Sequence, residues 1–261
     1  MGGWGDEAAA GAKPNTPAIP PAKTPEAAPA VTAAVAATPP ARPTPPVVEV
    51  GNLAFPKVER ARLANGIPVL LARRTAIPKL ALTLGFDAGI AADKVDRPGT
   101  QGTMLALLKE GTSGPRPRTA TQVLEEQERL GATIDAGAAM DTSAITLTAL
   151  TANLAPSLGL MRDMVRQPAF SPRDVARVKE QRLAALAQTQ SSPTSQAMRA
   201  LAPLLFGPAH PYGQPSDGLG DAASLKALTP AALRAAHAKW LRPDLARITV
   251  VGDITMAQLL P

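Results

Sequence analysis

The chain alternates between two patterns of apolar and polar positions, and the shorter pattern predicts β-strands. It is clearest in residues 143–151, where Ile145 and Leu147 alternate with threonines, as in a half-buried strand. Six segments are expected to form strands: residues 58–63, 67–72, 80–86, 132–138, 143–151 and 247–251. The first two flank Asn65 and Gly66, a dipeptide that favours a tight type I′ turn, and are therefore expected to form a hairpin.

The longer pattern repeats every three to four residues and predicts helices. Six segments are expected to be helical: residues 98–109, 119–130, 153–167, 171–190, 194–205 and 229–241. Thr119 and Gln122 match a capping box, and Ser171 followed by Pro172 is a typical N-cap with proline at the first helical position. Because strands and helices are grouped along the chain, they predict an α+β sandwich, a mostly antiparallel sheet with helices packed on one face.

Residues 1–50 show neither pattern. Half of them are proline or alanine, with a single Trp and no Phe or Tyr. Such a stretch cannot bury enough apolar surface to offset the chain entropy lost on folding, and proline-rich chains remain extended. We therefore expect a Pro/Ala-rich disordered spacer over residues 1–50 and a folded domain over residues 51–261.

Charge and composition exclude several classes of function. The net charge is +6, but the arginines are scattered among alanines with almost no aromatic residues for base stacking, so no nucleic-acid partner is expected. A solvated basic surface or a more acidic partner subunit explains this charge. The chain has no cysteine, which excludes disulfides, thiolate metal sites and a cysteine nucleophile.

The sequence also bears on location. Its apolar runs are far shorter than the roughly 18 residues of a membrane span, so no integral membrane segment is expected. The first residues lack the basic start and apolar run of a signal peptide. A Pro/Ala-rich spacer before a globular domain is nevertheless common just after an export signal, so a periplasmic or otherwise exported location is expected.

The residues alone indicate no catalytic site. A zinc site needs three or four converging side chains, whereas His210 lies in a Gly/Pro-rich segment and His237 on an expected helix, far apart in the sequence. Ser113 has no G-x-S-x-G context that would make it a nucleophile. Asp135 and Asp141 fit the polar ends of a hairpin.

Eight short segments, in a fixed order, resemble the insulinase/pitrilysin family of zinc metallopeptidases, to which the mitochondrial processing peptidase is related. They are Leu63–Gly66, Gly99–Thr112, Glu128–Ala132, Asn153–Leu154, Pro168–Ser171, His210–Gly213, Trp240–Asp244 and Val250–Ile254. No single segment is specific, but their order over roughly residues 51–257 implies the insulinase-like α/β sandwich.

In active members of that family, the helix that matches residues 99–112 carries H-x-x-E-H, two zinc-binding histidines and a general base. The resemblance places these positions at Gly102, Leu105 and Ala106, none of which can bind a metal. The third ligand, a glutamate, should fall at one of three residues that also cannot bind metal: Leu183, Ala184 and Ala185. Glu180 lies one turn away, but one carboxylate does not hold a zinc ion. The resemblance therefore implies no metal in this chain, and zinc only in a partner subunit.

The function implied by the resemblance is that of a non-catalytic lobe, inactive alone, that pairs with a zinc-bearing homologue to bind and help process peptides. Two alternatives are an active zinc metalloendopeptidase, against which the missing ligands argue, and a purely structural subunit of a larger complex. The match covers only the first of the two similar domains of a full subunit, so residues 51–261 are expected to be a first half. The substrate-binding residues stay unknown at this stage.

Overall fold

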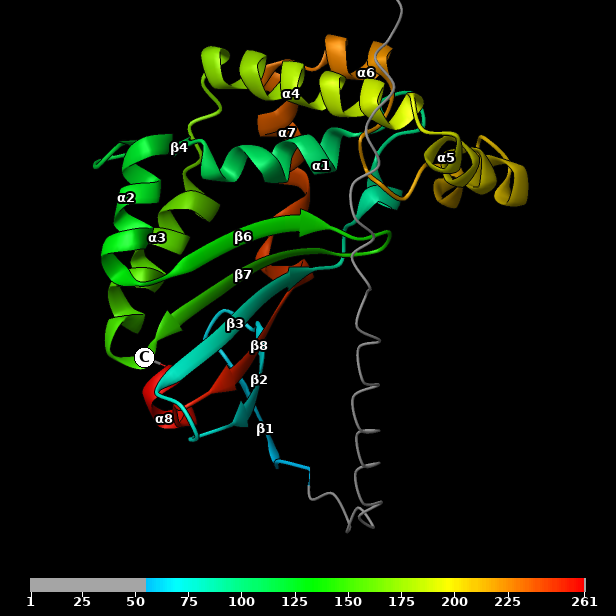
Figure 1. Cartoon of the computed structure of the whole chain (residues 1–261). Helices are drawn as coiled ribbons and strands as arrows, with labels where there is room; N and C mark the ends of the chain where they lie inside the picture. Colours follow the sequence, from blue (N-terminus) through cyan, green and yellow to red (C-terminus); the bar gives the residue numbers. More distant parts are fainter. Residues whose placement is uncertain (1–54, 261) are drawn as a thin grey trace, which may run out of the picture. The chain divides into compact units, whose positions relative to one another are not determined.

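The computed structural model describes residues 55–260, and its largest element is a six-stranded sheet (Figure 1). The strands are β1 (Val58–Arg62), β2 (Pro68–Arg73), β3 (Lys79–Phe86), β6 (Thr133–Ala138), β7 (Ser143–Leu150) and β8 (Ala246–Gly252). They lie in the order β1-β2-β8-β3-β7-β6, and only β2 and β8 pair in parallel. Two short strands, β4 (Gly111–Thr112) and β5 (Arg118–Thr119), form a separate pair.

Eight helices occur in the described residues, and several of them pack on one face of the sheet (Figure 1). They are α1 (Thr100–Ala106), α2 (Ala120–Leu130), α3 (Leu154–Arg166), α4 (Pro172–Gln190), α5 (Pro193–Phe206), α6 (Ala222–Ala227), α7 (Pro230–Trp240) and α8 (Met256–Leu259). The capping box at Thr119 and Gln122 and the Ser171 N-cap are both present. The predicted α+β fold with a mostly antiparallel sheet is therefore confirmed.

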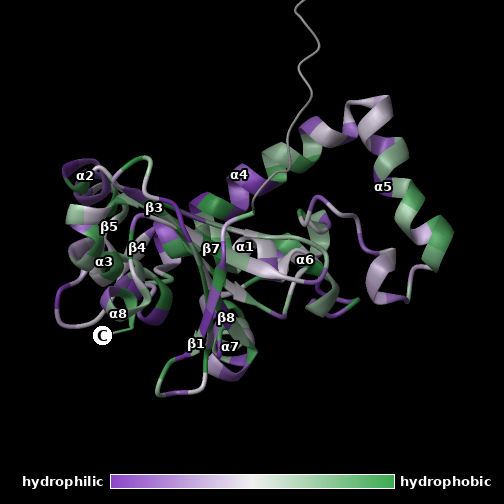
Figure 2. Cartoon of the chain, turned by 90° about the horizontal axis from the view of Figure 1, so that it is seen from below, coloured by the Kyte–Doolittle hydropathy of each residue, from purple (hydrophilic) through white to green (hydrophobic). Residues whose placement is uncertain are grey.

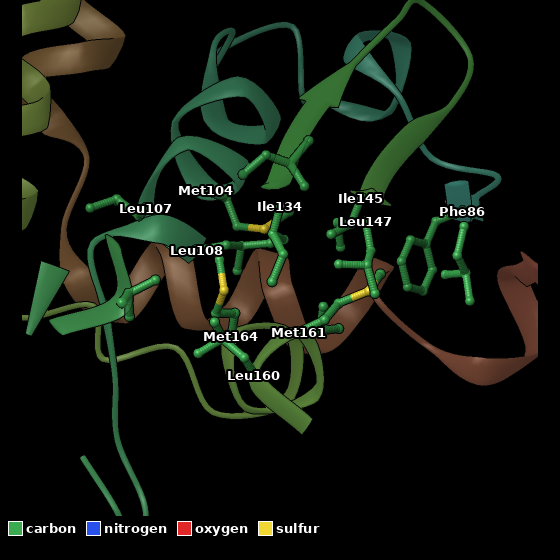
Figure 3. Packing of buried hydrophobic residues seen from close by; sticks show 14 of the residues in the cluster. Phe86, Met104, Leu107, Leu108, Ile134, Ile145, Leu147, Leu160, Met161 and Met164 are labelled. Atoms are coloured by element: carbon green, nitrogen blue, oxygen red, sulfur yellow. The ribbon is translucent and has the colours of Figure 1, made fainter. Parts of the chain in front are cut away.

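Strand alternation decides which side of the sheet becomes the core. In β7, Ile145 and Leu147 are buried, whereas the intervening Thr146 and Thr148 are only half-buried. Leu82 of β3 lies directly opposite Leu147, so the two buried sets share one face. Helix α1 supplies Met104 and Leu105, the 3₁₀ turn after it Leu108, and α3 Leu160, Met161 and Met164 to the same apolar cluster (Figure 3). Because aromatic residues are scarce, aliphatic and methionine side chains fill the core.

The structure differs from the expected elements in several places. The helix expected over residues 98–109 is an α-helix only to Ala106 and continues as a 3₁₀ turn over Leu107–Lys109. Helices α6 and α8 were not expected, because six and four residues are too short to show a helical period. The expected spacer over residues 1–50 lies outside the described residues and stays a prediction. Among residues 55–260, no helix is long and apolar enough to cross a membrane.

Candidate functional site

Helix α1 carries the three positions at which the sequence predicts degenerate zinc ligands. Leu105 is completely buried in the core, and Ala106 is half-buried against the same apolar cluster. Gly102 is half-buried on the side of α1 that faces α4 and the loop before α6. Two of the three positions therefore serve packing, and only Gly102 borders a polar region.

The space beside Gly102 is filled by an arginine and by backbone. A Cβ atom on Gly102 would lie 2.7 Å from Nη2 of Arg182, on α4, and 2.7 Å from the carbonyl oxygen of Gly218. Arg182 itself donates a hydrogen bond from Nη2 to that Gly218 carbonyl. Both distances are shorter than real Cβ contacts, so a histidine at this position would displace the loop as well as the guanidinium.

The expected third ligand position is equally unsuited to a metal. Leu183 packs against the core, whereas Ala184 and Ala185 are exposed on α4. Within residues 55–260, no group of three or more His, Asp or Glu side chains could hold a metal ion. A zinc ion therefore does not fit these residues: the positions offer no lone pairs, and a fixed positive charge already lies beside Gly102.

A buried polar cluster lies at the N-terminal end of α1. Asp93, Gln101 and Gln214 are almost completely buried. The Gln101 N–H donates to Oδ1 of Asp93 over 2.9 Å, and Nε2 of Gln214 donates to the Asp93 carbonyl over 3.1 Å. Burial raises the pKa of the Asp93 carboxyl to about 6, against the opposing effect of backbone N–H groups and the charge of Arg182. Burial also lowers the pKa of Arg182.

Two arginines hold the loop of residues 213–220 on the helical layer. Arg182 of α4 bonds the Gly218 carbonyl, and Arg199 of α5 pairs with Asp217 and donates to the Gly220 carbonyl. The approach is close enough that a Cβ on Gly220 would lie 2.2 Å from the Pro98 carbonyl oxygen. The loop therefore closes over the N-terminal end of α1, where an active family member would need room for a ligand.

Both histidines have structural partners. Nδ1 of His210 accepts a hydrogen bond from the Tyr212 N–H over 3.0 Å, and its ring stacks on Phe206. His237 of α7 places Nε2 2.7 Å from the Val165 carbonyl. Asp135 lies in β6 and Asp141 in the turn that follows it. Asp135 forms a salt bridge with Lys109, and Asp141 accepts a hydrogen bond from the Tyr212 hydroxyl.

The edge strand β6 offers a second kind of site, one made of backbone. Among residues 55–260, β6 pairs only with β7, and α1 lies alongside it (Figure 1). The Ile134 N–H points away from β7 and donates to Oε1 of Gln127 over 2.6 Å. Because strand groups alternate with a period of two, the N–H and C=O groups of Ala136 and Ala138 point the same way. In the described residues no further strand pairs with this side of β6, and Gly137 between the two alanines is exposed.

The N-terminal end of β6 borders a groove of about 870 Å³, which lies between β6, α2 and the start of α4. Charged side chains line it in pairs: Lys109 with Asp135 at 3.0 Å, and Arg177 with Glu110. A separate apolar groove of about 840 Å³ lies between α3, the sheet and α8. The charged groove adjoins β6, so an extended chain lying on this edge would reach it.

Fold and site together define an α+β domain whose candidate metal positions carry no ligand side chains and whose sheet ends, beside α1, in the edge strand β6. The chain belongs to the insulinase family: the pattern of Insulinase (Peptidase family M16) matches residues 69–205, slightly more than half of the chain. This membership agrees with the expectation drawn from the eight resembling segments.

Three relatives place the chain within that family. It is 32% identical to the peptidase M16 inactive domain from Pseudomonas fluorescens, with a TM-score of 0.72 over 77% of this chain and 48% of that one. The periplasmic protease PqqL from Escherichia coli shares the fold, at 18% identity and a TM-score of 0.69 over 78% of this chain and 23% of that one. An uncharacterized zinc protease from Rickettsia bellii (strain RML369-C) is 24% identical over 133 residues, 51% of this chain and 32% of that protein. The chain thus spans about a third to a half of the length of the relatives described as a zinc protease and an inactive domain.

The resemblance places the candidate metal positions on α1, but the sequence does not indicate what packs against them. Arg182 is adjacent to the expected ligand segment, yet its contact with Gly218 spans 36 residues. No local pattern in the sequence indicates that Arg182 reaches the surroundings of Gly102. The open edge at β6 gave no such signal, because strand order in a sheet depends on pairings distant in sequence.

Proposed function

We propose that this domain is a non-catalytic insulinase-family lobe that binds extended peptides along β6 and assists a zinc-bearing homologue in cleaving them. The observation that carries the proposal is the combination of filled metal positions on α1 with an open strand edge directly beside that helix. An edge strand binds a peptide through backbone hydrogen bonds, which tolerate many side chains. Positioning a peptide raises the rate of a partner's reaction without any catalytic contact from this domain.

The test uses the chain with a zinc-bearing homologue from the same source and an unfolded peptide substrate. We expect no cleavage by this chain alone and faster cleavage by the mixture than by the homologue alone. Ala136→Pro should reduce that gain, because proline removes an outward N–H of β6 without breaking the pairing with β7. A mixture no faster than the homologue alone would favour the alternative of a purely structural subunit. Cleavage by this chain alone that a chelator stops would favour an active metallopeptidase.

We also propose that the protein works outside the cytoplasm. The support is the Pro/Ala-rich composition of residues 1–50, typical of a spacer behind an export signal, and the likeness in fold to a protease described as periplasmic. Cell fractionation with cytoplasmic and periplasmic marker enzymes tests this location. Recovery with the cytoplasmic marker would contradict it.

A further inference from the structure

Helix α5 presents an unusually apolar surface. All of its residues are half-buried or exposed, and it stands away from the sheet with hydrophobic residues toward its C-terminal end (Figure 2). Met198, Leu201 and Leu205 recur at intervals of three and four residues and therefore share one side of the helix. Leu204 and Leu205 are 81% and 67% exposed. Neighbouring apolar side chains with this much exposed surface are uncommon on monomeric proteins.

No free charge interrupts this surface within α5. Its one charged residue, Arg199, turns toward the loop of residues 213–220, where it pairs with Asp217 and donates to the Gly220 carbonyl. Its other polar residues, Thr194, Ser195 and Gln196, are uncharged and lie in the N-terminal part of the helix. The remaining side is suited to apolar side chains and gives no electrostatic preference for either sign of charge.

The apolar surface continues to the far end of β6. Phe206, the last residue of α5, packs against His210 and Tyr212, with ring centroids 5.7 and 5.8 Å away. The Tyr212 hydroxyl donates to Asp141 over 2.7 Å, and Asp141 lies in the turn that directly follows β6. A chain paired with Ala136 and Ala138 therefore emerges beside these aromatic rings.

We propose that the α5 patch, made of Met198, Leu201, Leu204, Leu205, Phe206 and Tyr212, binds bulky apolar side chains of the peptide that pairs with β6. This inference rests on the proposed function and names its substrate class: unfolded polypeptides in which an apolar segment adjoins a stretch able to extend. The occupant follows from the continuity of the patch with the β6 edge and from the absence of free charge on α5. Backbone pairing at β6 gives binding of any sequence, and the patch adds selectivity for apolar residues.

The experiment measures fluorescence anisotropy of labelled unfolded peptides with the purified chain. Three peptides share a polar extended stretch; one carries a Leu/Phe block at its N-terminal end, one at its C-terminal end, and one has serines instead. We expect one of the two block peptides to bind at least tenfold more tightly than the serine peptide. Leu201→Ser with Leu205→Ser should remove that preference and leave the serine peptide's affinity unchanged. Ile77→Ser is the matched control, because Ile77 is 64% exposed and precedes β3 at the opposite end of the sheet from the β6–β7 turn.

The outcomes separate this inference from the proposed function. Ala136→Pro, or backbone N-methylation of the peptide, should weaken all three peptides if they add to β6. If these changes weaken binding but the double serine variant keeps the block preference, the α5 patch is overturned and peptide binding at β6 stands. If neither change weakens binding, addition at β6 is overturned, and this inference with it. Sedimentation that shows a dimer dissolved by the double serine variant, with or without peptide, would assign the patch to a second copy and overturn the inference.

Discussion

At the scale of single residues, the candidate metal positions on α1 take part in packing. Leu105 and Ala106 add to the core, and Gly102 permits the close approach of Arg182 and the Gly218 carbonyl. The guanidinium supplies a positive charge next to Asp93, whose carboxyl is otherwise buried. The residues at these three positions thus have packing or electrostatic roles of their own.

The closeness of this packing leads to a prediction about two helical glycines. Gly102→Ala should lower the free energy of unfolding by about 1–3 kcal/mol, because its methyl group overlaps the Gly218 carbonyl and the Arg182 guanidinium. Gly159→Ala, inside α3, is the matched control: a Cβ there meets no atom within 4 Å, so it should raise stability by up to ~1 kcal/mol. Urea denaturation of both variants measures the difference. Equal effects of the two substitutions would contradict the packing described for Gly102.

Asp93 gives a prediction about pH. Its pKa is raised to about 6 in the folded chain, from 3.8 in an unfolded one, so folding favours the protonated carboxyl. The stability that this proton confers is complete below pH 4 and is lost as the pH rises through 6. Asp93→Asn should therefore stabilise the chain relative to wild type at pH 7, by on the order of 2–3 kcal/mol, and lose that advantage near pH 4.

The measurement for Asp93→Asn is the difference in urea midpoint from the wild type between pH 4 and 8. Asparagine keeps an oxygen acceptor for the Gln101 N–H, so the hydrogen bond itself is preserved. Taking differences removes the contribution of Asp163, whose lowered pKa gives an opposite trend with pH. A difference that does not change with pH would show that Asp93 titrates normally.

At the scale of elements, the sequence predicts what depends on neighbours along the chain. The caps formed by Thr119 with Gln122 and by Ser171 with Pro172 depend on local hydrogen bonds and backbone preferences, and both are present. The β1–β2 hairpin also forms, but the expected type I′ turn at Asn65-Gly66 is wrong: Gly66 has a positive φ and Asn65 does not, and the Gly66 N–H donates to the Leu63 carbonyl, so the turn is centred one residue earlier. The loop over α1 is different, because its position depends on contacts made by Arg182 and Arg199 across 18 to 36 residues. The candidate site could thus be found by resemblance, but its closed geometry could not.

The loop itself supplies the prediction at this scale. Arg182→Met should leave the Gly218 carbonyl without its donor and loosen residues 213–220, because a buried carbonyl without a partner costs about 1–3 kcal/mol. Hydrogen exchange followed by mass spectrometry should show faster exchange in peptides covering residues 99–103 and 213–220. Arg173→Met, an exposed position on the same helix, is the control and should leave both peptides unchanged. Uniform acceleration across the whole domain would indicate general destabilisation and not a local role for Arg182.

At the scale of the whole molecule, the features divide into two sets. The helical layer around α1 is closed by arginines, glycines and buried polar groups, whereas the β6 edge and the α5 patch face outward. The chain belongs to the insulinase family, and the matching region makes up about a third to a half of the length of its relatives. This division is what the proposed function requires, because it keeps the proposed peptide-binding surfaces apart from the closed helical layer.

The closed layer leads to a prediction about zinc that simple restoration of ligands can test. We expect less than a tenth of a zinc ion per chain after dialysis, by mass spectrometry of the metal content.

Introducing Gly102→His, Leu105→Glu, Ala106→His and Leu183→Glu together should still give no tight zinc binding, because the Gly218 carbonyl and the Arg182 guanidinium occupy the space beside position 102. Adding Arg182→Ala to these four should allow partial binding, since removing the guanidinium frees space and removes a repelling charge. Circular dichroism establishes that each variant is folded, and stoichiometric zinc in the wild-type chain would refute the filled site. Tight zinc binding by the fourfold variant with Arg182 still present would show that the loop yields readily, and that the closure over α1 is not the barrier described.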